Sequence, residues 1–165
     1  MTQAFSTNNK VKSDMHSKSV VTVVLAICAV SATAAQSQTS TWDGVYTDAQ
    51  AARGSSKYVQ CAMCHGTVLE GNGEAPPLTG RFIPDWAGTT LADLFEKVQT
   101  TMPLYAPGTL SAGDTTDLIA FLLKSNNFPA GSTELAPSID VLKKISFDAA
   151  KPPTNFKSVG SGLKK

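Results

Sequence analysis

Apolar residues recur at helical spacing in two segments in the middle of the chain. In the first segment they occupy positions i, i+3, i+4 and i+7, which share one helical face: Leu91, Leu94, Phe95 and Val98. Thr90 directly precedes this stripe and Asp93 follows three residues later, which is the pattern of a capping box. We expect this helix to end near Thr100, because Pro103 disfavours helical backbone at the residue before it.

The second segment predicts a helix that opens at Ser111, with Asp114 completing another capping box. Its apolar residues form a broad face that must be buried: Leu118, Ile119, Phe121, Leu122 and Leu123. Residues 126–129 read Asn-Asn-Phe-Pro and should end the helix.

An earlier alanine-rich stretch predicts a helix from Thr47, a good N-cap, to about Gln60. Gly54 lies inside this helix and lowers its intrinsic stability. Such a glycine either marks the close approach of another helix or is an ordinary surface position. Tyr58 lies one turn further along the same face, and the helix that opens at Ser111 is the natural partner.

The other segments carry weaker patterns. Residues 36–46 form a polar lead-in whose Trp42 and Tyr46 are expected to pack on the domain. The glycine- and proline-rich residues 66–80 predict a loop. Side chains suited to a core or a pocket follow this loop: Phe82, Ile83 and Trp86.

Residues 129–165 form a C-terminal extension beyond the domain proper, which we place at residues 47–128. One short helix, from Ser138 to Ile145, should dock on the domain. The last dozen or so residues are rich in lysine, proline and glycine, and we expect them to be mobile.

Residues 1–35 have the organisation of a secretory signal. Three lysines precede an apolar run from Val20 to Val30, and small residues follow up to Ala35. We expect cleavage after Ala34 or Ala35, a periplasmic location, and no stable membrane span in the processed chain. The alternative is a retained membrane anchor, although the apolar run is short for a bilayer.

The length of 165 residues suggests one domain, and its charge is nearly balanced. The full chain has 14 basic and 13 acidic residues; residues 1–35 contain three lysines and one aspartate, so the remainder has 11 basic and 12 acidic residues. Because no strong basic field results, nucleic acid is not an expected partner.

Residues 61–65 read Cys-Ala-Met-Cys-His, the spacing typical of c-type haem attachment. On a helix, Cys61 and Cys64 lie close together on one face, so both thiols can form thioethers with the vinyl groups along one haem edge. His65 follows directly and can ligate the haem iron.

Three other interpretations of this motif stay open: chance, a redox-active dithiol and a zinc site. A dithiol does not explain His65. Zinc prefers four protein ligands, or three and a water, whereas the processed chain offers only Cys61, Cys64 and this histidine, adjacent in sequence.

A haem attached at this motif would also interact with residues outside the motif. A ligating histidine usually donates its second ring N–H to a carbonyl or carboxylate, which fixes the orientation of its ring. Our candidate acceptor in the loop after His65 is the carbonyl oxygen of Pro76.

Methionine is our candidate for the second axial ligand of the iron. The chain has four methionines, of which Met1 and Met15 precede the expected cleavage site and Met63 lies between the two cysteines. Met102 remains, in a loop stiffened by proline and glycine. Methionine is otherwise a flexible core filler, but here elimination and position favour ligation, and His/Met ligation suits electron transfer.

Together these residues resemble the class I cytochrome c family, over roughly residues 46–125. The resemblance implies an all-α cytochrome c fold, with three to five helices around one covalently attached haem c and a C-terminal extension. It also implies thioether bonds at Cys61 and Cys64 and axial ligation by His65 and Met102. The chain-end helices should cross near Gly54.

Residues 44–54, 73–76 and 128–131 look more narrowly like the cytochrome domains that accompany bacterial pyrroloquinoline-quinone alcohol dehydrogenases. The catalytic quinoprotein part is absent from this chain, so at most the chain would serve as its electron acceptor.

We therefore expect an electron-transfer protein rather than an enzyme, a periplasmic one-electron carrier between a dehydrogenase and a respiratory acceptor such as a terminal oxidase. One alternative is a haem enzyme or sensor in which peroxide or a diatomic gas displaces Met102. Another is a subunit held permanently in a larger complex by the C-terminal tail.

Overall fold

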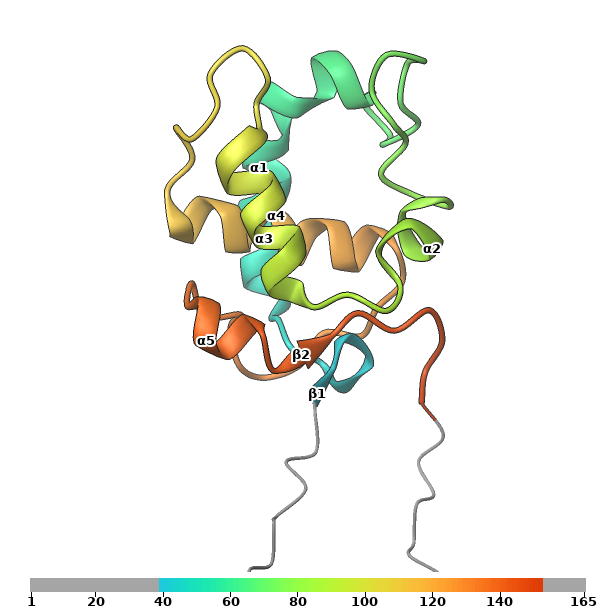
Figure 1. Cartoon of the computed structure of the whole chain (residues 1–165), viewed down its shortest axis with the longest axis vertical. Helices are drawn as coiled ribbons and strands as arrows, with labels where there is room; N and C mark the ends of the chain where they lie inside the picture. The colour runs from blue at the N-terminus through green and yellow to red at the C-terminus, as the bar shows by residue number, and fades with distance from the viewer. Residues whose placement is uncertain (1–38, 153–165) are drawn as a thin grey trace, which may run out of the picture. The chain divides into compact units, whose positions relative to one another are not determined.

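The structure is a computed structural model that describes residues 39–152, and these residues form a helical domain (Figure 1). Its α-helices follow in chain order: α1 (Asp48–His65), α2 (Phe82–Trp86), α3 (Leu91–Thr101), α4 (Ala112–Ser125) and α5 (Ile139–Leu142). A 3-10 helix, η1 (Thr41–Asp43), lies near the start, and two short strands, β1 (Thr39–Ser40) and β2 (Ile145–Ser146), pair in parallel. The all-α fold class is confirmed, and these two-residue strands were not expected from the sequence.

The expected signal at residues 1–35 lies outside the described residues, as does most of the tail that we expect to be mobile. Within residues 39–152, no helix is both long enough and apolar enough to cross a bilayer.

Helix α1 begins where the sequence predicts and ends later. The Thr47 side chain accepts a hydrogen bond from the Gln50 N–H at 3.1 Å, as expected of an N-cap. The helix does not stop near Gln60 but continues to His65, and the chain then turns at Gly66, whose φ is +82°. The two cysteines of the attachment motif therefore lie on the last turns of a regular helix.

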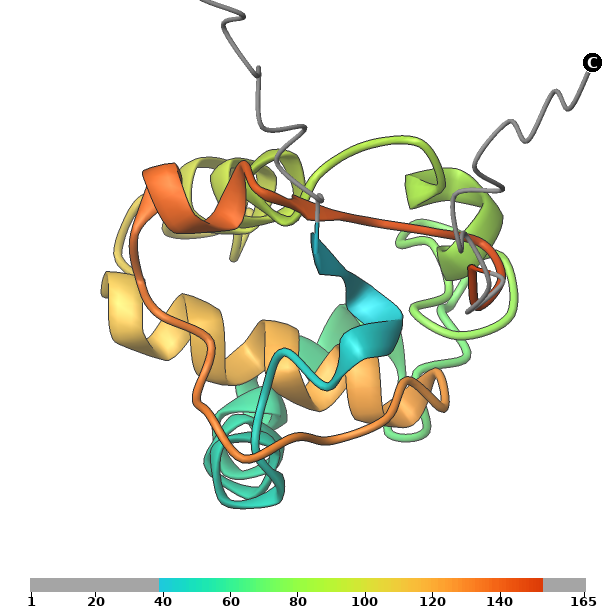
Figure 2. The ribbon, with the colours of Figure 1, turned by 90° about the horizontal axis from the view of Figure 1, so that it is seen from below.

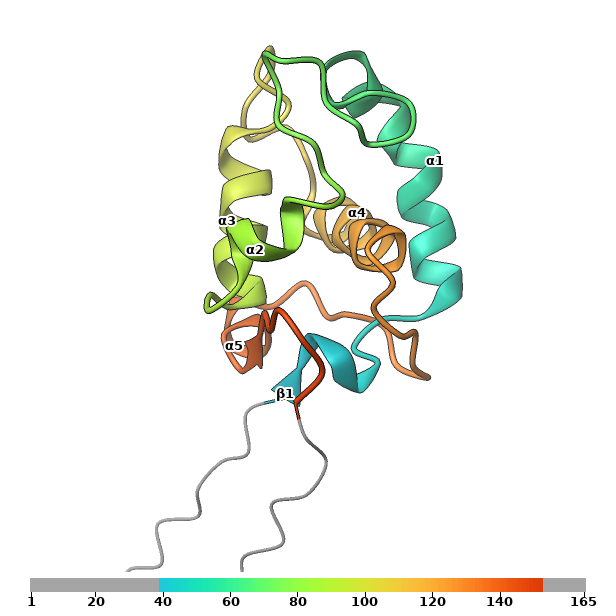
Figure 3. The same cartoon turned by 90° about the vertical axis from the view of Figure 1, so that its right-hand side faces the viewer.

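Helices α1 and α4 cross at Gly54. A Cβ atom at this position would lie 1.9 Å from the Asp117 carbonyl oxygen, so only glycine allows the two backbones to approach this closely. One turn along α1, the Tyr58 ring lies with its centroid 5.2 Å from that of Phe121. Figure 3 shows α4 nearly end-on, whereas α1 runs from top to bottom in the plane of the picture, so the two helices cross steeply. Gly54 is thus not an ordinary surface position.

Helix α3 forms the opposite wall of the domain. The capping box of Thr90 and Asp93 is present, and the helix ends at Thr101, within one residue of the expected position. Leu91, Leu94 and Phe95 of its apolar stripe are buried. Ser111 caps α4 by accepting a hydrogen bond from the Asp114 N–H, although the full reciprocal capping box is not formed.

The lead-in packs on the domain, as expected. The buried Tyr46 hydroxyl donates a hydrogen bond of 2.6 Å to the Phe128 carbonyl oxygen, and the Trp42 ring lies 4.6 Å from the Phe128 ring. From below, Figure 2 shows the lead-in and the residues after α4 crossing under the helices.

The described part of the C-terminal extension belongs to the core. Helix α5 is shorter than the predicted span from Ser138 to Ile145, but it docks through the fully buried Leu142. Further apolar side chains of the extension are also buried: Leu135, Ile145 and Phe147. The extension up to this point is therefore part of the packed domain rather than an appendage.

Candidate functional site

An apolar pocket of about 310 Å³ lies between the end of α1, the loop that follows it, α2, α3, the loop after α3, and α4. Its volume is typical of small-molecule and cofactor sites. The residues that line it are Tyr58, Gln60, Cys61, Cys64, His65, Glu74, Ala75, Pro76, Leu78, Phe82, Trp86, Leu94, Lys97, Val98, Met102, Pro103, Leu104, Tyr105, Leu110, Leu118 and Leu122. Every candidate site residue that the sequence suggested is among them.

The cysteine pair lies on the C-terminal turns of α1. Cys61 is half-buried and Cys64 is exposed, and no disulfide joins them. Burial, and secondarily the neighbouring Cys64, raises the pKa of the Cys61 thiol above its usual range. Helical spacing places both sulfur atoms on one side of α1, where they face the same pocket.

His65 is the last residue of α1 and is buried, with 9 % of its surface exposed. Its Nδ1 lies 2.9 Å from the Pro76 carbonyl oxygen. Because a carbonyl oxygen can only accept, Nδ1 carries the hydrogen and Nε2 keeps a free lone pair for a ligand.

The loop around this histidine is tied at both sides. The Gly71 N–H donates to the His65 carbonyl oxygen at 2.8 Å, and the Tyr58 hydroxyl donates to the Gly66 carbonyl oxygen at 2.8 Å. Burial raises the pKa of Tyr58 to about 12, so its hydroxyl remains a donor throughout the physiological pH range. These bonds fix the backbone on which the imidazole is carried.

Met102 reaches the same pocket from another element. It caps the C-terminus of α3 in extended conformation, with its N–H donating to the Val98 carbonyl oxygen at 3.0 Å. Met63, by contrast, is 76 % exposed and does not line the pocket. Of the two methionines in the described part of the chain, only Met102 therefore lies at the site.

The residues present fit a c-type haem. The pocket offers an imidazole nitrogen, a thioether sulfur and two thiols, surrounded by apolar walls, and this donor set matches His/Met-ligated haem. Across residues 39–152, no group of three or more histidine, cysteine, aspartate or glutamate side chains is arranged to hold a metal ion.

Comparison with protein-family models gives one match. Residues 49–122 match the model described as cytochrome C oxidase, cbb3-type, subunit III. Residues 49–122 are therefore similar to a cytochrome c domain, and the described residues have the all-α cytochrome c fold. Comparisons with curated proteins and with solved structures gave no match.

The cytochrome c match covers α1, α2 and α3 and most of α4, and so contains every candidate site residue. It establishes haem c, covalently bound and containing iron, as the cofactor of this domain. Domains of this family generally transfer electrons rather than catalyse reactions.

Sequence reasoning did not identify several pocket residues. Leu94 and Leu118 belong to apolar stripes that were predicted as core, and periodicity alone could not show that part of each stripe faces a cofactor. Among the described residues, Lys97 is the one lysine that lines the pocket, and nothing in its sequence context marks it. The hydrogen bond from the Tyr58 hydroxyl to the Gly66 carbonyl oxygen could not be predicted either, because the sequence indicated only the face of α1 on which Tyr58 lies.

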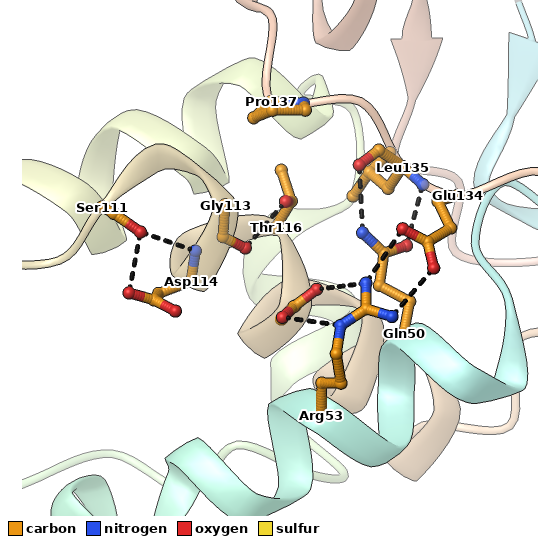
Figure 4. A pocket seen from close by; sticks show the side chains of 10 residues that line it. Gln50, Arg53, Ser111, Gly113, Asp114, Thr116, Glu134, Leu135 and Pro137 are labelled. Atoms are coloured by element: carbon orange, nitrogen blue, oxygen red, sulfur yellow. Dashed lines mark hydrogen bonds and ion pairs between the residues drawn. The ribbon is translucent and has the colours of Figure 1, made fainter.

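A second cavity, of about 290 Å³, lies beside α1 and is polar (Figure 4). Arg53 lines this cavity and binds Asp117 of α4 and Glu134 of the extension, at 2.9 Å each. Beside it, the buried Gln50 side chain exchanges hydrogen bonds of 3.0 and 2.8 Å with the Leu135 backbone. The cavity's charged groups satisfy one another, so its role is to fasten the extension to α1 and α4.

Proposed function

We propose that this cytochrome c domain is a periplasmic one-electron carrier whose single haem is ligated by His65 and Met102. The observation that carries the proposal is the shared pocket: His65 and Met102 approach it from different elements, and the cysteine pair lies at its edge. When bound, the haem supplies a one-electron couple whose potential His/Met ligation raises.

Each residue has a separate role in this proposal. Cys61 and Cys64 attach the cofactor through thioethers, and the Pro76 carbonyl holds the His65 ring in the tautomer that leaves Nε2 free. Met102 would hold the iron through its thioether sulfur. If His65 and Met102 both bound the iron, the chain would leave no open position for a substrate, which favours a carrier over an enzyme or a gas or peroxide sensor.

The rim of the pocket suits transfer to another protein. Leu104 and Tyr105 line the pocket and are 72 % and 65 % exposed, so an apolar edge reaches the surface. A partner protein that docked on this edge would make a small contact, and small interfaces are typical of transient redox encounters. Against peroxide chemistry, the pocket-lining residues include no arginine and no second histidine.

The partners are also a proposal. The family match to a subunit of a cbb3-type oxidase supports a terminal oxidase as acceptor. The sequence likeness to cytochromes of quinoprotein alcohol dehydrogenases supports such a dehydrogenase as donor. A permanent subunit would co-elute with its complex in size-exclusion chromatography of the native protein, whereas a transient carrier would elute alone.

The decisive test is the absorption spectrum of the protein produced with haem-attachment machinery, oxidised and reduced, with and without carbon monoxide. We expect a sulfur-to-iron charge-transfer band in the oxidised form and no response to carbon monoxide. Met102→Ala should lose the band and bind carbon monoxide, while the matched control Met63→Ala should behave as wild type. A wild-type protein with a high-spin spectrum, or one that readily binds carbon monoxide, would contradict His/Met ligation.

A further inference from the structure

The C-terminal extension contacts the haem pocket from behind through one side chain. Phe147 is fully buried, and its ring meets that of Phe82 edge-on, with centroids 5.7 Å apart and planes at 78°. Phe82 in turn lines the pocket. Phe147 itself does not line the pocket, so any effect it has on the site acts through Phe82.

The backbone at Phe147 is joined to the same wall. Its N–H donates to the Thr89 carbonyl oxygen at 2.9 Å, and its carbonyl oxygen accepts from the Gly88 N–H at 2.9 Å. Residues 88–89 connect α2 to α3, and both helices contribute pocket-lining side chains. The extension therefore holds the connection between two elements of the pocket wall.

Residues of the lead-in also bind the extension, at the residue next to Phe147. The Ser40 hydroxyl donates to the Asp148 carboxylate at 2.5 Å, and the Trp42 indole N–H donates to the Asp148 carbonyl oxygen at 3.0 Å. Phe147 also packs on Phe128, with ring centroids 5.3 Å apart. Phe147 is thus fully buried, and residues from both ends of the domain bind or pack against its segment.

We propose that Phe147 is a positioning residue for the haem site: it holds Phe82 and the α2–α3 connection against the pocket and so keeps water from that face of the cofactor. This inference rests on the proposed function. The apolar shell around a redox centre controls solvent access and local dielectric, and through them the reduction potential. Because the oxidised iron carries one more positive charge, water admitted behind Phe82 would stabilise it and lower the potential.

The test compares Phe147→Ala and Phe147→Leu with Leu135→Ala in the full-length haem protein. Leu135 is a buried apolar residue of the same extension, with 2 % of its surface exposed, but it lies at the polar cavity and not at the haem pocket. Leu135→Ala therefore controls for loss of stability without a change at the pocket wall.

Potentials are read by redox titration followed in the absorption spectrum, and amide hydrogen exchange is measured over residues 82–98. For Phe147→Ala we expect the reduction equilibrium to shift about tenfold towards the oxidised form, which is about 59 mV for one electron. Exchange in α2 and α3 should also accelerate. Phe147→Leu should show a smaller shift, and Leu135→Ala should keep the wild-type potential.

Equal potentials in Phe147→Ala and Leu135→Ala, with wild-type exchange in α2, would overturn the inference while leaving the carrier function intact. If the alanine variant is not recovered, the leucine variant decides on the same criterion. A wild-type protein without attached haem would instead contradict the proposed function, and the inference with it.

Discussion

The two cavities of this domain have nearly the same volume and opposite chemistry. The haem pocket, of about 310 Å³, is walled mainly by apolar side chains, and His65 and Met102 are among the residues that line it. The polar cavity, of about 290 Å³, is filled by groups that bind one another, with Arg53 between two carboxylates. Volume therefore does not identify a binding site here. The difference lies in whether the donor atoms already have partners within the chain.

We expect the greatest difference between the two cavities when the covalent attachment of the haem is removed. Cys61→Ala combined with Cys64→Ala should abolish thioether-linked haem, because no other cysteine lies among the described residues. The measurement is the mass of the denatured protein, which should lose the mass of one haem. Arg53→Gln, in the polar cavity, should keep the full haem mass; loss of haem from this control would show that the two cavities are not independent.

The crossing of α1 and α4 lies between the two cavities and should be the next most sensitive point. Gly54→Ala would place a methyl group 1.9 Å from the Asp117 carbonyl oxygen, and overpacking of this kind costs about 3 kcal/mol. Urea unfolding of the haem protein gives the free energy. Gly113→Ala is the matched control, since a Cβ there meets nothing closer than 4.0 Å. Similar stability of the two variants would contradict the close approach.

The side chain of Gln50 allows the polar cavity to be tested separately from the haem pocket. Gln50→Ala leaves the buried Leu135 N–H and carbonyl oxygen without their partner, which should cost about 2 kcal/mol of unfolding free energy. The absorption spectrum should not change. Gln60→Ala, an exposed residue of the haem pocket, should change stability by less than about 0.5 kcal/mol. A spectral change in Gln50→Ala would mean that the polar cavity does influence the haem.

The smallest expected effect is a pH dependence. Hydrogen bonds from Lys57 and Ser111 hold the pKa of Asp114 below its usual range in the folded state. The carboxylate therefore adds stability above the unfolded-state pKa of about 3.9, and this contribution is lost as the pH falls through the lower folded value. Because 39 % of the Asp114 side chain is exposed to solvent, which screens the interaction, only about a few tenths of a kcal/mol are expected.

Urea unfolding of wild type and Asp114→Asn at pH 6 and at pH 2 measures this contribution. The gap in unfolding free energy between the two proteins should be present at pH 6 and should shrink at pH 2. A gap that is the same at both values would exclude the carboxylate as its source.

The helices were predictable where a local signal fixes their ends. The Thr90–Asp93 capping box and Pro103 placed α3 to within one residue, because caps and prolines act on adjacent backbone. The end of α1 was missed by five residues, since the alanine pattern stops near Gln60 while the helix continues to the glycine after His65. The β1–β2 pair is two residues long and carries no periodicity to detect.

The residues of the candidate site were likewise predictable only where a local sequence signal exists. Residues 61–65 form a contiguous motif, so the sequence alone suggested their chemistry. The remaining walls of the pocket come from four helices, α1 to α4, and from the loops after α1 and α3, and their meeting depends on how these segments pack together. The contact of Phe147 with Phe82 joins residues 65 positions apart, and no local pattern announces it.

The pairing of β1 with β2 has a practical consequence for attaching this protein to other things. It brings residues 39–40 beside residues 145–146, and Figure 1 shows this pair at the opposite end of the domain from the C-terminal end of α1. A linker, a fused domain or an electrode surface joined near either strand would hold the domain by its base and leave the haem edge facing outwards. The same adjacency of two segments far apart in the sequence makes the domain suitable for circular permutation.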